Sequence, residues 1–168
     1  MEENIGLRNK LKQTLTSLWT GELASVLLFW GTFFHFKGNH LDNRAFIAIF
    51  YSLLILSLIL VQGAVYWMIL IKRLSDPQFG ENTVGSIYRV LKISDMVLIC
   101  LGIPLHICLH NSAITTLISS ALLIFAFVEW VNYFQWRLSY SYNPVVVIRY
   151  TIRGKLKKSK IAKEIETI

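Results

Sequence analysis

The sequence predicts an all-α integral membrane protein, a bundle of four transmembrane helices running alternately up and down. The chain of 168 residues is 54% hydrophobic and only 16% charged, whereas soluble domains usually carry about 25% charged residues. Its apolar residues gather in four blocks, each close to the roughly 20 residues that a helix needs to cross a bilayer. Segments rich in turn-forming residues, such as KGNHLDN and HNS, separate these blocks.

The first predicted element is a short amphipathic helix over residues 1–17, on the cytoplasmic side. Its leucines and the first residue of the next block recur at helical spacing: Leu7, Leu11, Leu15 and Leu18. This pattern is typical of a helix that lies on a membrane surface. A cytoplasmic extension of the first span explains it equally well. We expect no cleavable signal peptide, since the segment has no short apolar core followed by a small-residue cleavage site.

The transmembrane domain is predicted over 18–136, with spans at 18–36, 45–71, 88–109 and 113–136. The second span is the clearest because it contains no charged residue. The other three each contain one acidic residue: Glu22, Asp95 and Glu129. Pro104 is expected to kink the third span, because proline removes a backbone hydrogen bond within a helix.

The distribution of lysine and arginine predicts that both termini are cytoplasmic. Basic residues flank the first span on its N-terminal side and the loop between the second and third spans: Arg8, Lys10, Lys12, Lys72, Arg73, Arg89 and Lys92. The opposite side has only Lys37 and Arg44. Cytoplasmic loops carry such an excess, and indole rings favour the interface. Four tryptophans fall near the predicted inner interface: Trp19, Trp67, Trp130 and Trp136.

A basic cytoplasmic tail is predicted over 137–168, with eight basic and two acidic residues. Such a cluster beside anionic lipid contributes roughly 1 kcal/mol of attraction per basic side chain near the surface. The residues expected to contact lipid or an acidic partner are Arg149, Arg153, Lys155, Lys157, Lys158 and Lys160. The partners expected are anionic lipids, a second copy of the chain or another membrane protein. Nucleic acid is not expected, because no aromatic residues interleave with the basic ones in a recognition motif.

A layer of polar residues is predicted toward the inner side of the membrane, with a contribution from every span. Its members are Glu22, Gln62, Asp95, Glu129 and Asn132. Ionisable groups at this depth are costly unless paired or hydrated, so they indicate either structural pairing or a cation or proton pathway. Lys92 precedes Asp95 by three residues, which predicts an ion pair on one helix face. Glu129 has no basic residue at that spacing.

A second cluster of interest consists of the histidines on the predicted outer side: His35, His40, His106 and His110. His106 and His110 share one helix face if the helix continues that far. Imidazole groups that converge there suit zinc or copper. Histidines at the end of a membrane helix also occur as plain interfacial residues, and this interpretation is favoured. No cofactor is therefore expected.

The sequence contains no phosphate-binding glycine loop, no G-x-S-x-G elbow and no H-E-x-x-H motif. The favoured hypothesis is a non-enzymatic membrane subunit that acts through self-association or a partner. The alternatives are a proton- or cation-coupled transporter or channel that uses the inner acids, and an intramembrane metalloenzyme that uses the outer histidines. The Ile-, Lys- and Asn-rich composition suggests a bacterial plasma membrane.

Overall fold

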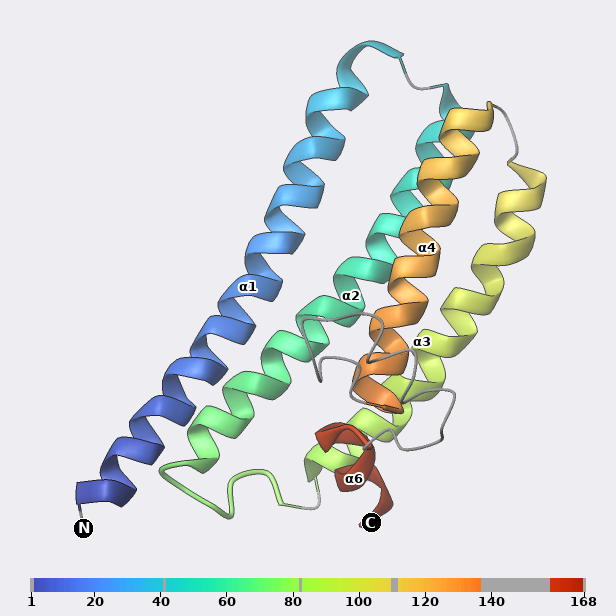
Figure 1. The fold of residues 1–168 in the computed structure, drawn as a ribbon. Coiled ribbons are helices and arrows are strands. Elements are labelled where there is room, and N and C mark those ends of the chain that lie inside the picture. The colour runs from blue at the N-terminus through green and yellow to red at the C-terminus, as the bar shows by residue number, and fades with distance from the viewer. Residues whose placement is uncertain (1, 41, 82, 110–111, 137–157, 168) are drawn as a thin grey trace, which may run out of the picture.

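The computed structural model describes residues 2–40, 42–81, 83–109, 112–136 and 158–167, and within them the protein is all-α. Four long helices lie along one another in alternating directions, and both ends of the chain lie at the same end of the bundle (Figure 1). A short fifth helix lies at that end. The described helices are α1 (Glu2–His40), α2 (Asn43–Arg73), α3 (Thr83–Cys108), α4 (Ala113–Phe134) and α6 (Lys160–Glu166).

Three of these helices, α2, α3 and α4, are long and apolar enough to cross a membrane. In this coarser form the prediction of a multi-pass membrane protein is supported. The observed bounds lie within a few residues of the predicted spans 45–71, 88–109 and 113–136. The helix α1 is longer than the other three but less apolar than they are.

The N-terminal region differs from the predicted surface helix, because α1 is one helix from Glu2 to His40. Its 39 residues extend for about 58 Å at 1.5 Å per residue, well beyond a hydrocarbon core of about 30 Å. No proline interrupts it, and Gly21 is tolerated within it. A separate helix over 1–17 is therefore not formed, and the geometry is that of an extension of the following helix.

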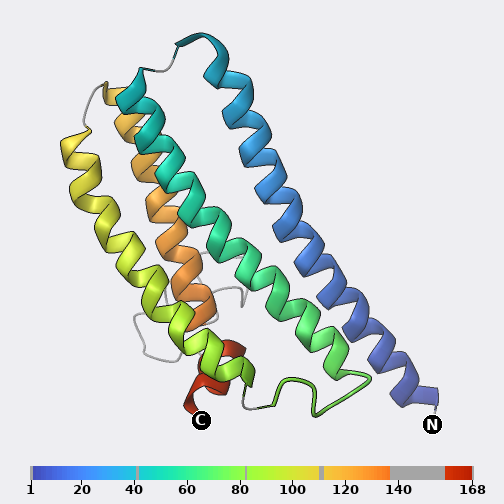
Figure 2. The same ribbon diagram turned by 180° about the vertical axis from the view of Figure 1, so that it is seen from behind.

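The centre of the bundle is α2, which packs against α1, α3 and α4. Figure 2 shows it between α1 on one side and α3 and α4 on the other. In its most apolar stretch 56% of the residues are buried, against 17% in α3 and 22% in α4. Leu56 and Ile59 are fully buried in the main core. The outer faces of α3 and α4 are apolar and exposed, as expected of helices that face lipid.

The helices α3 and α4 meet through close packing and one tryptophan. Gly102 lies against Leu123, whose methyl groups would be 3.0 Å from a Cβ added at that glycine. The indole of Trp130 donates to the Lys92 carbonyl at 3.0 Å. Trp130 is 5% exposed, so its ring is buried between helices, and its predicted depth near the inner interface stays a prediction. The helix α3 continues past Pro104 to Cys108.

The last described part of the predicted basic tail is a helix packed against the bundle. Helix α6 packs against α3 and α4, and it buries Ile161, Ala162 and Ile165. Ser159 caps the helix by accepting from the Ala162 amide at 2.9 Å. The physical reason is the spacing of the apolar residues, since positions four apart share one helix face.

Candidate functional site

A cavity of about 210 Å³ is lined by side chains from α1, α2, α4 and α6. The backbone of α1 approaches α2 alone among the described helices. The space between α1 on one side and α4 and α6 on the other is therefore bounded by side chains and not by closely packed backbones. These are Leu11, Thr14, Leu15, Leu18, Glu22, Tyr66, Trp67, Asn132, Tyr133, Ser159, Lys160 and Ile161.

The leucines predicted to face the membrane surface face this cavity instead. Leu11, Leu15 and Leu18 form its α1 wall, and Leu15 is only 3% exposed. Leu15 is thus the buried member of the stripe, whereas Leu11 and Leu18 line the cavity but remain 40% and 37% exposed. Leu7, one turn further out, is 71% exposed.

Glu22 is the acidic residue of the cavity wall, and one of its carboxylate oxygens has two donors. The Trp67 indole donates to Oε1 at 2.6 Å, and the Tyr133 hydroxyl donates to the same oxygen. Two donors on one oxygen are an arrangement that suits a carboxylate, which only accepts. The other oxygen, Oε2, is buried and has no hydrogen-bond partner among the described residues.

Gly63 of α2 makes this arrangement possible. A Cβ added at Gly63 would lie 2.5 Å from Cζ of Tyr133 and 2.7 Å from Oε2 of Glu22. Both distances are far below van der Waals contact, so any larger residue would displace the pair. The close approach of the Glu22–Tyr133 bond to the α2 backbone thus requires glycine at this position.

Glu129 and Asn132 lie near Glu22 on the α4 side. The Asn132 side-chain amide donates to Oε2 of Glu129 at 3.3 Å, and Glu129 is close enough to Glu22 to interact with it electrostatically. Asn132 lines the cavity, whereas Glu129 does not. Two of the three predicted inner acids therefore lie in one region, and one of them reaches the cavity.

Asp95 and Gln62 form a second, separate polar pair between α3 and α2. Asp95 is 2% exposed, and its Oδ1 accepts from the Gln62 amide at 3.0 Å. The Tyr88 hydroxyl donates to the Gln62 carbonyl at 2.7 Å. Neither Asp95 nor Gln62 lines the cavity. Successive residues of a helix differ by about 100°, so Gln62 and its neighbour Gly63 face different sides of α2.

The predicted Lys92–Asp95 ion pair is wrong. The ion pairs within the described residues are Arg73–Glu164 and Lys158–Glu166. Asp95 points instead toward α2, where Gln62 offers a neutral donor. Residues three apart on a helix are neighbours, but a buried acid adjacent to another helix takes its partner from that helix.

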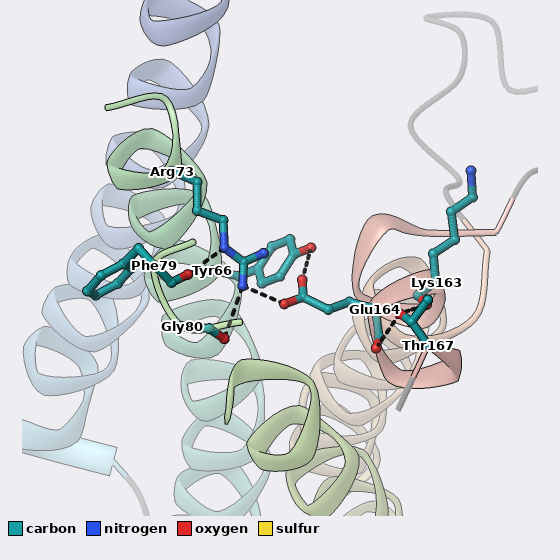
Figure 3. Close-up of polar contacts among 7 residues, drawn as sticks. All are labelled: Tyr66, Arg73, Phe79, Gly80, Lys163, Glu164 and Thr167. Carbon is teal, nitrogen blue, oxygen red and sulfur yellow. Dashed lines mark hydrogen bonds and ion pairs between the residues drawn. The ribbon is translucent and has the colours of Figure 1, made fainter. Parts of the chain in front are cut away.

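The C-terminal helix is fastened to the bundle by Glu164, as Figure 3 shows. Its carboxylate accepts from Arg73 at 2.6 Å and from the Tyr66 hydroxyl at 2.9 Å. Arg73 also donates to the carbonyls of Phe79 and Gly80, at 2.8 and 3.3 Å. One arginine thus ties together the end of α2, the following loop and α6.

The predicted lipid-contact residues fall into two groups. Arg149, Arg153, Lys155 and Lys157 lie outside the described residues. Lys158 forms an exposed ion pair with Glu166 at 2.6 Å, and Lys160 lies at the cavity. Both lysines are exposed, so contact of the described part of the tail with lipid or an acidic partner stays a prediction.

The predicted histidine cluster is only partly described, since His110 and the side chain of His40 lie outside the described residues. His106 is bonded on both ring nitrogens: Nε2 lies 3.1 Å from Ser52 Oγ, and Nδ1 lies 2.7 Å from the Gly102 carbonyl. Within the described ranges no three His, Cys, Asp or Glu side chains form a group suited to a metal. The described contacts make His106 a link between α3 and α2.

Sequence reasoning missed the residues that complete the site. Gly63, Tyr66, Trp67 and Tyr133 carry no motif, and Trp67 had been assigned to the membrane interface. The packing of α6 had a detectable signal, because a serine followed by isoleucines at four-residue spacing is typical of a capped amphipathic helix. The sequence carries no comparable signal for the residues of α2 and α4 that contact Glu22, because these contacts depend on how the helices are rotated against each other.

The described part of the chain is an all-α fold in which three helices are long and apolar enough to cross a membrane. Comparison of the chain with protein-family models, with curated proteins and with solved structures finds no significant match.

Proposed function

We propose that the protein is a four-span plasma-membrane protein of bacterial type, with both termini in the cytoplasm. The support is the position of α1, which packs along α2. A helix that lies along a transmembrane helix occupies the same slab of bilayer. The residues Leu27, Leu28 and Phe34 of α1 are exposed and suit contact with lipid. The excess of basic residues at the end carrying both termini supports the proposed orientation.

Accessibility of engineered thiols tests this topology. Cysteines replacing Asn39 and Asn111 should react from outside with a reagent that cannot cross the membrane, while cysteines replacing Gln78 and Lys163 should not. Lys163 is exposed, so a cysteine at this position is accessible to a reagent on the inner side. Both native cysteines, Cys100 and Cys108, are exposed and must first be replaced by serine. Outside labelling at position 78 would contradict the proposal.

Within this topology, the favoured function is that of a non-enzymatic membrane subunit that associates with itself or with another membrane protein. The observation that carries it is the one-sided packing of α1 against α2. The opposite face of α1 is open, and a Cβ added at Gly21 or Gly31 meets nothing within 4 Å. Small residues on a membrane helix allow another helix to approach closely.

The polar residues of the bundle support a structural role as well. Trp30 bonds to Ser57, Tyr51 to the Leu98 carbonyl, and Gln62 to Asp95. Each of these bonds joins two neighbouring helices. Polar groups used in this way fix the rotation of helices against one another, and they leave few side chains for chemistry.

Crosslinking on the open face of α1 tests the association. A cysteine replacing Ala24, which is exposed, should form a disulfide between copies or crosslink to a partner in native membranes. The matched control is a cysteine replacing Val26, which packs against the core. Native mass measurement in mild detergent should show more than one chain per particle. A monomer that crosslinks at neither position would contradict the proposal.

A second candidate, a cation or proton pathway, is favoured by one observation. Glu22 reaches a cavity, and Glu129 lies close to it. Asp95 lies on the other side of α2 and has no part in this version of the proposal. Flux into proteoliposomes that is lost in both Glu22→Gln and Glu129→Gln, and kept in Asp95→Asn, would establish it. If the wild-type protein shows no flux, this second candidate function is contradicted.

A further inference from the structure

We propose that the cavity between α1, α2, α4 and α6 binds a small substituted ammonium group, carried either by a free amine or by a zwitterionic lipid headgroup. The inference concerns the cavity and not the open face of α1. It therefore does not depend on the association proposed above, and the experiment below reads binding rather than oligomeric state.

The size of the cavity limits the ligand. Its volume of about 210 Å³ corresponds to about seven water molecules at 30 Å³ each. Pockets for drug-sized molecules occupy about 300–1,000 Å³. A headgroup or a simple amine fits this space, whereas a large aromatic drug does not.

The charge of the wall selects a cation. Glu22 takes part in no ion pair among the described residues, and Glu129 adds a second carboxyl nearby. The donors that Glu22 does have, Trp67 and Tyr133, are neutral. They leave its carboxylate without an ion-pair partner among the described residues, and the one cationic side chain of the lining is Lys160, at the α6 side of the cavity. A cation brought into the cavity would supply that partner.

The aromatic residues select a particular kind of cation. Tyr66, Trp67 and Tyr133 all line the cavity. Tryptophan and tyrosine rings attract ammonium groups through their negative faces, and this is the usual mode of recognition for methylated ammonium ions. A metal ion, in contrast, would require several oxygen ligands around one point, which these walls do not offer.

Lys160 distinguishes the two sources of such a group. It is an exposed residue of the cavity lining, contributed by α6. Its positive charge would oppose a free amine. It would favour a lipid headgroup, because the phosphate next to the ammonium would then have a basic partner at the edge of the cavity.

Calorimetric titration of the full chain in mild detergent tests the proposal, with choline as the probe and its neutral isostere 3,3-dimethyl-1-butanol as the control. We expect choline to bind about tenfold more tightly, the difference that one ammonium–aromatic contact beside a carboxylate provides. Glu22→Gln should abolish the preference. Asp95→Asn removes an acid outside the cavity and should leave it unchanged. Trp67→Leu provides a second test if Glu22→Gln does not fold.

The second arm measures the thermal stability of the protein in nanodiscs of phosphatidylethanolamine or of phosphatidylglycerol. A lipid source predicts higher stability with the former, reduced by both Glu22→Gln and Lys160→Gln. A free amine as the source predicts no lipid preference and tighter choline binding in Lys160→Gln. Equal binding of choline and its isostere, or no choline binding together with no lipid preference, would overturn the proposal.

Discussion

Arg73 and Glu164 form an ion pair of 2.6 Å that joins the last turn of α2 to the C-terminal helix, 91 residues later in the chain. Their side chains are 20% and 19% exposed. The pair is further surrounded by Tyr66 and by two loop carbonyls (Figure 3). Hydrogen bonds to charged groups in such partly buried sites contribute about 1.5–3 kcal/mol.

This relationship predicts that Arg73→Gln and Glu164→Gln each lower the free energy of unfolding in detergent by about 1–3 kcal/mol. The two losses should not add in the double variant, since the residues share one interaction. The matched control is Lys158→Gln. It breaks an ion pair of the same length whose side chains are 54% and 56% exposed, and such pairs contribute about 0–1 kcal/mol. Equal losses of unfolding free energy at both pairs would show that the Arg73–Glu164 pair does not stabilise the packing of α6 more than an exposed ion pair does.

The packing of α6 leads to a second prediction. Ile165→Ala should cost about 2–4 kcal/mol of stability, because the isoleucine is 8% exposed and packs in the main core. Protease cleavage near residues 158–167 should become faster at the same time. Lys163→Ala changes an exposed residue of the same helix and should do neither. A silent Ile165→Ala would mean that α6 is not held against the bundle.

Gly63→Ala is predicted to disturb the cavity directly. The added methyl group would fall within 2.7 Å of both Glu22 and Tyr133, so the hydrogen bond between them must shift. Overpacking of this kind costs about 1–3 kcal/mol. Gly6→Ala is the control, since nothing lies within 4 Å of its added Cβ and alanine favours helix. We expect a lower melting temperature for the first variant only.

Asp95→Asn is predicted to be neutral or stabilising, which reverses the expectation from the sequence. An ion pair with Lys92 would have made this change costly, but Asp95 bonds to Gln62. Its Oδ2 and the Gln62 Oε1 are both buried without a partner among the described residues. An amide at position 95 replaces the unpartnered Oδ2 with a donor for which Gln62 Oε1 is an acceptor, and it removes a buried charge.

The matched control for this prediction is Asp95→Leu, which keeps the branching at Cγ and the number of side-chain heavy atoms but removes both oxygens. It leaves the Gln62 amide without its acceptor, so it should destabilise by about 1–3 kcal/mol. Thermal unfolding in detergent distinguishes the two. A large loss in Asp95→Asn would indicate that the charge itself has a partner.

The sequence by itself determined the class of this protein, because long apolar blocks and few charges are properties of single segments. The bounds of α2, α3 and α4 followed from the same local information. Ser112 and Ser159 cap α4 and α6, and such caps are likewise a local property of the chain. Hydropathy and helix capping depend on residues that are close in the sequence, so both can be inferred without a structure.

Only the tertiary structure decided which polar residues meet. Glu22, Asp95 and Glu129 are predicted at similar depths in the membrane. In the structure, Asp95 contacts one side of α2, whereas Glu22 and Glu129 lie near another side of the same helix. The rotation of α2 is set by close contacts, above all by Gly63 beneath Tyr133. The fastening of Glu164 to Arg73 likewise joins segments far apart in the chain. A one-residue change in helix phase moves a side chain by about 100°, so partners across helices cannot be inferred from spacing within one helix.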